Sequence, residues 1–308
     1  MQYDASGGGR YDLLVVGSAN VDLVIGVERR PAPGETVLGS DLAVHPGGKG
    51  ANQALAAARL GARAALLARV GDDEHGRLLL ASQRAAGVDT DGVLVGGAPT
   101  GVALITVDPS GDNSIVVSPG ANGRLTPADV RAAAPLLAAA RVVSLQLEIP
   151  LETVAETVRG LAPDARLVLN PSPPAPLPAE VLAACDPLVV NEHEARYVLG
   201  AAAGETPQDW ARGLLALGPR SVVITLGAQG AVVAEGHADS LHHLPSPRVD
   251  AVDTTGAGDA FTAALAWRLG RGDELRRAAA FAVRVGAATV TARGAQDSFP
   301  TPEQVDAV

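Results

Sequence analysis

The chain has 308 residues, of which 47% are hydrophobic and 19% charged, so it can form a substantial core and is not expected to be globally disordered. Its formal net charge of −10 argues against a nucleic-acid backbone as partner, and aromatic residues, at 3%, offer few platforms for stacking single strands. Cys185 is the only cysteine, so no internal disulfide can form.

The first ten residues, 1–10, are polar and contain three consecutive glycines, which predicts a flexible tail without the apolar core of a signal peptide. The alanine-rich runs further along are too short to cross a bilayer. We therefore expect a cytoplasmic protein without a membrane partner.

A buried strand is expected over 13–16, and it leads into a loop of small residues that ends at Asn20. The chain continues in extended form over 21–25, and another short strand is expected within 36–44. Asn20 and Asp22 lie two apart, so they project to one side of an extended chain and could together bind two hydroxyls. Two strands without an intervening helix suggest a small antiparallel addition.

A second glycine loop, 45–53, precedes a helical run over 54–60. Its spacing differs from the GxxxxGK[ST] pattern of a P-loop, so that class of phosphate site is not supported. Lys49 and Asn52 fall in the first turn of the predicted helix, where they could grip a polyol. The alternative is that the glycines form a linker and Asn52 only starts the helix.

A strand over 64–70 and a helix over 76–86 follow. Two further strands, 100–107 and 114–117, are joined by the turn-forming residues 108–113, which is a hairpin signal. We expect this hairpin to join the early strands in one additional sheet.

From residue 127 onward, helices and apolar strands alternate, and each strand ends in a polar or glycine-rich loop. This pattern predicts a parallel sheet with helices on both faces, whose carboxyl ends line one cleft. The expected elements are helices over 127–140 and 151–160 and strands over 142–148, 167–170, 188–190 and 221–225. Polar residues at these strand ends are Glu148, Asn170, Asn191 and Thr225.

Asn191 and Glu194 lie three apart across a predicted strand-to-helix turn, so both can face one point. With Glu192 they could hold Mg²⁺ through its waters, because that ion keeps much of its hydration. The alternative is that they form a helix-capping arrangement.

The segment 253–259, Asp-Thr-Thr-Gly-Ala-Gly-Asp, precedes an apolar helical run, and Val249 and Val252 before it are interpreted as a strand end. Backbone N–H groups at a helix N-terminus lack partners and favour anions, and glycines let a phosphate approach them. A carboxylate repels phosphate, so Asp259 suits proton removal from an attacking hydroxyl better than binding alone. The alternative is a simple turn with Asp259 as a cap.

Two of these segments, 47–54 and 253–259, resemble the two signatures of the ribokinase-like (PfkB) carbohydrate kinases. The similarity extends to 15–22, 33–36, 100–104 and 294–296. The lysine in the first signature resembles the ribokinase branch more than the fructokinase or adenosine kinase branches.

The resemblance implies a three-layer α/β sandwich with a mostly parallel central sheet and a small β-sheet lid. It implies a core formed by 11–20, 45–97 and 119–308 and a lid formed by 21–44 and 98–118. The lid is expected to join two chains in a homodimer. The implied activity is ATP-dependent phosphorylation of ribose at O5.

The resemblance also implies roles for single residues. Asp259 would be the general base, and the anion hole would comprise Gly256, Ala257 and Gly258. The sugar would be bound by Asn20, Asp22, Gly48, Lys49, Asn52, Glu148 and Asp259. ATP would be bound by Asn191, Thr225, Gly227, Gly230 and Gly258, with Asn191 and Glu194 organising Mg²⁺ and the phosphates.

The resemblance also implies a monovalent cation, K⁺, which would be surrounded by the Asp253 carboxylate, the Thr255, Thr289, Ala292 and Gly294 carbonyls and the Ser298 hydroxyl. The bound cation would hold the loop that carries the anion hole in one conformation. Asp297 stands where related ribokinases often carry proline. The alternative is that Asp253 caps a turn and pairs with Arg293.

Other functions stay open at this stage. One is a kinase for deoxyribose, another pentose or a nucleoside, because a single hydroxyl contact separates ribose from 2-deoxyribose. The other is a sugar- or nucleotide-sensing protein without turnover, against which the intact Asp259 argues.

Overall fold

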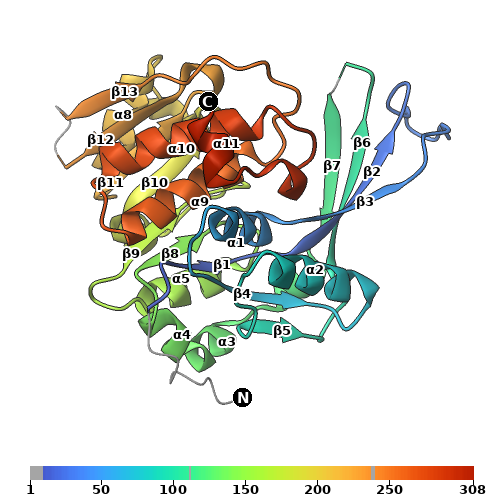
Figure 1. Cartoon of the computed structure of the whole chain (residues 1–308), viewed down its shortest axis with the longest axis horizontal. Coiled ribbons are helices and arrows are strands. Elements are labelled where there is room, and N and C mark those ends of the chain that lie inside the picture. The colour runs from blue at the N-terminus through green and yellow to red at the C-terminus, as the bar shows by residue number, and fades with distance from the viewer. Residues whose placement is uncertain (1–9, 111, 237–239) are drawn as a thin grey trace.

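The computed structural model describes residues 10–110, 112–236 and 240–308. The predicted tail over 1–10 lies outside these residues except for Arg10. Within them the chain forms a nine-stranded sheet, helices that cover it on both faces, and a four-stranded sheet that projects from one side (Figure 1). None of the described helices is long and apolar enough to pass through a membrane.

The nine-stranded sheet is the middle layer, with strand order β13-β12-β11-β10-β9-β8-β1-β4-β5. Neighbouring strands from β5 to β11 are parallel, whereas β12 and β13 are antiparallel additions at one edge. The strands are β1 (Leu13–Val16), β4 (Ala64–Val70), β5 (Val93–Val95), β8 (Val142–Leu145), β9 (Arg166–Leu169), β10 (Cys185–Asn191), β11 (Ser221–Thr225), β12 (Ala231–Glu235) and β13 (Leu241–Leu244).

Side chains alternate across each strand, so the sheet contributes to a separate apolar core on each face. In β1, Leu13 and Val15 belong to one core, and Leu14 and Val16 belong to the other. The first face is covered by α1 (Lys49–Arg59), α2 (Glu74–Ala85), α9 (Ala257–Gly270), α10 (Leu275–Thr289) and α11 (Pro302–Asp306). The second is covered by α3 (Pro127–Ala132), α4 (Ala134–Ala138), α5 (Leu151–Arg159), α6 (Ala179–Ala184), α7 (Glu192–Leu199) and α8 (Pro207–Ala216). The predicted three-layer sandwich is therefore confirmed.

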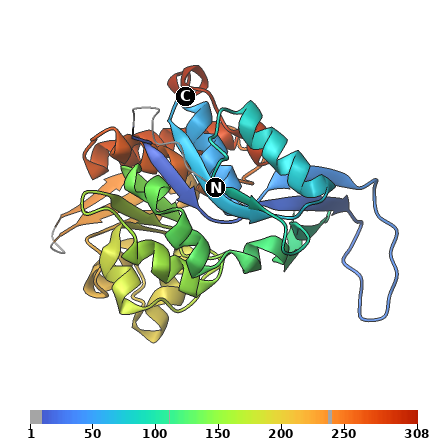
Figure 2. The ribbon, with the colours of Figure 1, turned by 90° about the horizontal axis from the view of Figure 1, so that it is seen from below.

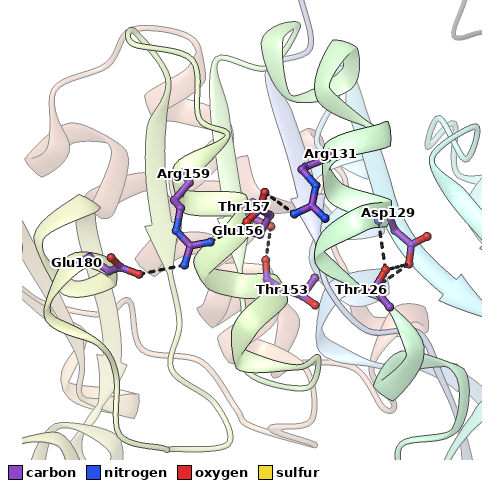
Figure 3. A network of polar contacts seen from close by, with 8 residues as sticks. All are labelled: Thr126, Asp129, Arg131, Thr153, Glu156, Thr157, Arg159 and Glu180. Atoms are coloured by element: carbon purple, nitrogen blue, oxygen red, sulfur yellow. Dashed lines mark hydrogen bonds and ion pairs between the residues drawn. The ribbon is translucent and has the colours of Figure 1, made fainter.

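The helices of the second face are also connected at their surface (Figure 3). Glu156 of α5 accepts hydrogen bonds from Arg131 of α3 and Arg159, and Arg159 also reaches Glu180 of α6. The two arginines lower the pKa of Glu156. Exposed ion pairs of this kind contribute little free energy, so the apolar core beneath them holds this layer in place.

The four-stranded sheet has the order β3-β2-β6-β7, with β2 (Asn20–Gly26), β3 (Ala43–Gly47), β6 (Gly101–Val107) and β7 (Asn113–Ser118). The β6–β7 hairpin and its pairing with the early strands agree with the sequence. The early strands β2 and β3 are antiparallel, as expected, whereas β2 and β6, whose relative direction was not predicted, are parallel. Each follows a strand of the large sheet, β1 or β5, and runs away from the main body (Figure 1).

The strand expected within 36–44 is present only from Ala43 onward. The segment before it is a loop that extends from the end of the small sheet (Figure 2), and Leu38 in it is 94% exposed. A single bridge between Val27 and Gly39 is the only pairing of this loop within the described residues. Without a partner strand, its extended sequence pattern does not produce a ladder.

Two further expectations are wrong in detail. The helix predicted over 127–140 is divided into α3 and α4, because Pro135 has no N–H to donate and starts a new turn. The strand end predicted at Val249 and Val252 is a loop. There the N–H groups of Val252 and Asp253 both donate to the carbonyl of Val290 after α10, so no strand neighbour is engaged.

Candidate active site

The candidate residues lie at one edge of the large sheet, where its parallel strands end. β1 lies between β4 and β8, so the chain connections diverge at this point and leave a crevice at the carboxyl ends. Glu148 follows β8 and Asn170 follows β9, while Asn191 and Thr225 are the last residues of β10 and β11. The structure therefore places all four strand-end residues along one rim.

Asp259 lies in the first turn of α9 and is only 8% exposed. The turn before it requires glycine at Gly256, whose φ of 76° is left-handed and where a Cβ would come within 2.8 Å of Phe299. A Cβ at Gly258 would meet nothing within 4 Å, so space is open above this turn. Ala257 N–H donates to Thr254 O at 3.2 Å, so one of the three predicted anion-hole donors is engaged within the loop.

The N-terminus of α1 approaches β2 closely, and glycines make this approach possible. A Cβ at Gly47 would lie 2.3 Å from Asp22 Oδ2, and one at Gly48 would lie 2.5 Å from Asn20 N. Lys49 and Asn52 lie in the first turn of α1, as predicted, and Asn52 Nδ2 donates to Asp259 Oδ2 at 2.9 Å. The two glycine loops therefore meet through Asn52 and Asp259, which are 207 residues apart in sequence.

Glu148, in the loop after β8, caps the N-terminus of α1. Its Oε2 accepts hydrogen bonds from Lys49 N at 3.2 Å, from the Ser18 hydroxyl and from Asn20 Nδ2 at 3.5 Å. A carboxylate is favourable at a helix N-terminus, where the first N–H groups have no helical partner. This arrangement brings the predicted sugar-binding residues of β2, β8 and α1 together.

The site concentrates negative charge around one lysine. Burial, followed by the nearby Glu148 and Asp259, raises the pKa of Asp22 from 3.8 to about 7. Burial acts to lower the pKa of Lys49, but Asp259, Glu148 and Glu194 outweigh it and the net pKa is raised. Lys49 is therefore a firmly charged cation among carboxylates, and the group as a whole can both donate to and accept from hydroxyls.

Several polar residues of this region were not predicted. Asn122 donates to Asn20 Oδ1 at 2.7 Å and accepts from Ala19 N, so it fixes the end of the first loop. No sequence signal distinguishes it within its glycine-rich turn. Gln53 donates to Asp259 Oδ1 at 3.3 Å and contacts the buried Ser144 and Gln146. These two alternate with apolar residues in and after β8, and that alternation was a usable signal.

Two cavities open at the rim. A cavity of about 190 Å³ is lined by Lys49, Asn191, Glu194 and Asp259, among others. A cavity of about 520 Å³ has largely apolar walls. Its lining includes Gly227, Gly230, Val249, Ala257, Phe261, Val283 and Val290. Thr225 and Gly258 line both cavities. Five of the predicted sugar-binding residues are not part of the lining of either cavity: Asn20, Asp22, Gly48, Asn52 and Glu148.

Asn191 and Glu194 form a capping box at the start of α7, which is the alternative weighed for them. Asn191 Oδ1 accepts from Glu194 N at 2.8 Å, and Glu194 Oε2 accepts from Asn191 N at 2.9 Å. Asn170 Nδ2 also donates to Glu194 Oε2 at 3.1 Å. Both side chains nevertheless line the smaller cavity, so capping orients them toward it.

The predicted cation segments also meet. Gly294 N donates to Asp253 Oδ2 at 2.8 Å, while Thr255 donates to Asp253 Oδ1 through its N–H and hydroxyl. Burial acts to raise the pKa of Asp253, but these hydrogen bonds lower it overall. Asp253 therefore caps a turn, which is one part of the alternative, and the nearby charge of Arg293 also lowers its pKa. The Ser298 hydroxyl donates to Ala295 O, and Thr289 O accepts from Ala292 N at 3.3 Å.

Comparison with known proteins assigns this arrangement to a family. Residues 11–302 match the family model described as pfkB family carbohydrate kinase. The chain is 41% identical to a ribokinase of Bacillus subtilis over 297 residues, which cover 96% of this chain and 98% of that protein. It is 36% identical to a deoxyribokinase of Salmonella typhi, with 95% and 97% covered. The structure of Arabidopsis thaliana ribokinase complexed with ribose and ATP superposes with a TM-score of 0.85 at 31% identity, with 97% and 98% covered.

Proposed function

This chain belongs to the pfkB family of carbohydrate kinases, and from that premise we propose that it transfers the terminal phosphoryl group of ATP to O5 of D-ribose. The products are ribose 5-phosphate and ADP. The observation that carries the proposal is the position of Asp259. It lines the smaller cavity directly after Gly258, which lines both cavities, so a hydroxyl and a phosphate can meet beside it.

Ribose is bound by the groups around the N-terminus of α1. Its hydroxyls donate to the carboxylates of Asp22 and Glu148 and accept from Lys49 and the amides of Asn20 and Asn52. Gly48 lets the backbone come close enough for these contacts, since a side chain there would clash with β2. The pKa of Asp22 is raised to about 7 mainly by burial, which fits a carboxyl group that is already enclosed before the sugar binds.

Asp259 acts as the general base. As O5 attacks the γ-phosphorus, its proton passes to Asp259, and the bond from that phosphorus to the β–γ bridging oxygen breaks to release ADP. The N–H groups of Gly256, Ala257 and Gly258 face the charge that develops on the transferring group. For Ala257 this contact would replace its long bond to Thr254.

ATP occupies the larger cavity, whose volume lies in the usual range for small-molecule sites and whose apolar walls suit a purine ring. Thr225, Gly227 and Gly230 are part of its lining. Asn191 and Glu194 would hold Mg²⁺ mainly through water, and no cluster of three or more acidic, histidine or cysteine ligands exists among the described residues. Bound Mg²⁺ would supply neutralisation of the phosphate charge.

The residues also fit a monovalent cation such as K⁺. Asp253 is ionised and accepts a hydrogen bond from Gly294, so it joins two loops. The oxygens of these loops that would bind the ion are the Thr255, Thr289, Ala292 and Gly294 carbonyls and the Ser298 hydroxyl. The ion would supply positive charge that fixes the loop carrying Gly256 to Gly258.

We further propose that the molecule is a homodimer through its small sheet. The use of ATP supports the cytoplasmic location expected from the sequence.

A second candidate substrate is 2-deoxyribose, which the 36% identity to a deoxyribokinase supports. The two sugars differ by one hydroxyl, and the carboxylates and amides beside α1 can serve either. A site built to bond a hydroxyl rejects the analogue that lacks it, so a direct comparison of the two sugars decides between them.

The chemistry is tested with Asp259→Asn, which keeps the shape of the side chain and removes the base. We expect kcat to fall by roughly 10²–10⁴-fold, with little change in ATP binding measured by calorimetry. Near-normal turnover would return Asp259 to the role of a structural residue at the start of α9.

A further inference from the structure

A small cluster of polar side chains is fully buried between the large sheet and α1. Gln53 of α1, Ser144 of β8 and Gln146 after β8 are each 0% exposed. In β8 the neighbours Val143 and Leu145 point to the core of the opposite face, so Ser144 and Gln146 face α1 and α9. Packing alone would favour apolar residues at these positions.

The contacts fix the orientation of the Gln53 amide. Gln53 Nε2 donates to Asp259 Oδ1 at 3.3 Å, and Gln53 Oε1 accepts from the Ser144 hydroxyl at 2.7 Å and from Gln146 Nε2 at 2.5 Å. An ionised carboxylate can only accept hydrogen bonds, so Gln53 must present its nitrogen to Asp259. The reversed amide would set its oxygen against that carboxylate and its nitrogen against the Gln146 nitrogen.

The other carboxylate oxygen is held separately. Asp259 Oδ2 accepts from Asn52 Nδ2 at 2.9 Å, and Asn52 Oδ1 accepts from Gln296 Nε2 at 3.0 Å. Asn52 is 6% exposed and belongs to the proposed sugar site, whereas Gln53 is 0% exposed and its other side-chain contacts are the fully buried Ser144 and Gln146. Gln53 therefore contacts Asp259 from the side away from substrate.

We propose that Gln53 is a positioning residue for Asp259, held in place by Ser144 and Gln146. Resting on the proposed role of Asp259 as base, it fixes the plane of the carboxylate before the sugar binds. Groups that are already oriented need not reorganise during the reaction, which lowers the barrier to proton transfer. A residue with this role affects kcat and leaves substrate binding unchanged.

The structure also shows that the cluster is not simply a favourable piece of core. Gln146 Oε1 is buried without a hydrogen-bond partner among the described residues. It lies so close to the first loop that a Cβ at Gly17 would come within 2.1 Å of it. An unsatisfied buried oxygen is unfavourable. The position of the Gln146 side chain is therefore not explained by stability alone, but it does allow its Nε2 to donate to Gln53.

The test is Gln53→Met, which nearly keeps the side-chain volume and removes the amide. We expect kcat to fall by roughly 10–100-fold, the usual loss when a charged group loses a hydrogen bond, with KM for ribose and for ATP within about twofold of the parent. The matched control is Gln83→Met. Gln83 is equally buried and donates to α1 at Ala51 O, but it does not contact Asp259. This control should retain kcat within about twofold.

The same substitutions are then made in the Asp259→Asn protein, whose residual turnover no longer uses a base. If Gln53 acts through Asp259, Gln53→Met lowers this residual kcat by less than about twofold. An equal fall in both backgrounds, an unchanged kcat in the single variant, or a change confined to KM would overturn the proposal. A near-normal Asp259→Asn enzyme would instead contradict the role of Asp259 itself, so the two failures are distinguishable.

Ser144→Ala provides a second route in case Gln53→Met does not fold. It removes one of the two donors to Gln53 Oε1 and leaves the bond from Gln53 to Asp259 in place. We expect a fall in kcat of about threefold to tenfold that is again absent in the Asp259→Asn background. A kcat equal to that of the parent would overturn the proposal.

Discussion

At the scale of single residues, the site contains a carboxylate that is suited to binding the sugar but lowers the stability of the sugar-free protein when it is ionised. Asp22 is enclosed beside Glu148 and Asp259, and its pKa is raised to about 7. In the unfolded chain its pKa returns to about 3.9, so the folded protein binds the proton more tightly. The contribution of Asp22 to the free energy of unfolding is therefore greatest at low pH and is lost as pH rises toward 7.

This predicts that Asp22→Asn stabilises the sugar-free protein, and more so at pH 8 than at pH 5. The amide cannot ionise, so the variant avoids the repulsion that the parent acquires above pH 7. The melting temperature of parent and variant at the two pH values measures the effect. Asp41→Asn, in the exposed loop before β3, is the control. A stabilisation that is equal at both pH values would contradict this reading of Asp22.

The residues at loop-to-helix junctions were the most predictable. Lys49, Asn52 and Asp259 were placed in first helical turns because glycine loops preceded apolar runs, and the structure has them there. The contact between Asn52 and Asp259 could not be predicted, since it depends on how α1 and α9 pack. Asn122 was missed for the same reason: its partners Ala19 and Asn20 are about a hundred residues away.

At the scale of elements, the parallel strands with partners on both sides were predicted to within a few residues, whereas the antiparallel β12, which also has two partners, was not predicted. The errors fall where tertiary contacts override the local pattern. Residues 36–42 have strand-like composition but no partner strand, and the chain before Asp253 bonds to Val290 after α10 instead of to a strand. The parallel pairing of β2 with β6 was missed because hairpin signals describe only neighbouring strands.

The loop pair around Asp253 carries a prediction at this scale. Initial rates should rise when K⁺ replaces a bulky organic cation at constant ionic strength, because the ion would fix the turn that holds Gly256 and Gly258. The rise should disappear in Asp253→Ala and persist in Asp250→Ala, an exposed aspartate of the same segment. A flat response of the parent enzyme would rule out activation by the ion.

Arg59, at the end of α1, supports the same loop from the other side. Its Nη1 donates to the carbonyls of Gln296, Asp297 and Phe299. This contact ties the helix of the first signature to the loop that follows α10. The helix of the first signature is therefore linked to the loop that follows α10, in addition to its contact with the second signature through Asn52 and Asp259.

At the scale of the whole molecule, the small sheet exposes apolar side chains. Val44, Leu104 and Val116 are 44%, 51% and 66% exposed. Leu104 pairs with Val116 and with Leu23, which in turn pairs with Val44, so they form one row across the four strands. An exposed apolar row of this kind is typical of a protein interface, and we propose that the same sheet of a second copy packs against it.

Sedimentation at micromolar concentration should therefore give a dimer. Val116→Lys should shift the protein toward the monomer, because it places a charge on the most exposed of these three side chains, at the β7 end of the row. Leu217→Lys, on an exposed leucine after α8, should leave the dimer intact. A parent protein that sediments as a monomer would contradict this assembly.

The central claim, phosphorylation of ribose, is tested most directly by comparing sugars. With ATP as donor, kcat/KM is measured for D-ribose, 2-deoxyribose, fructose and adenosine under one set of conditions. The arrangement of Asn20, Asp22, Lys49 and Asn52 predicts that D-ribose has the highest value. A tenfold advantage for any other acceptor, equivalent to about 1.4 kcal/mol of transition-state stabilisation, would contradict it.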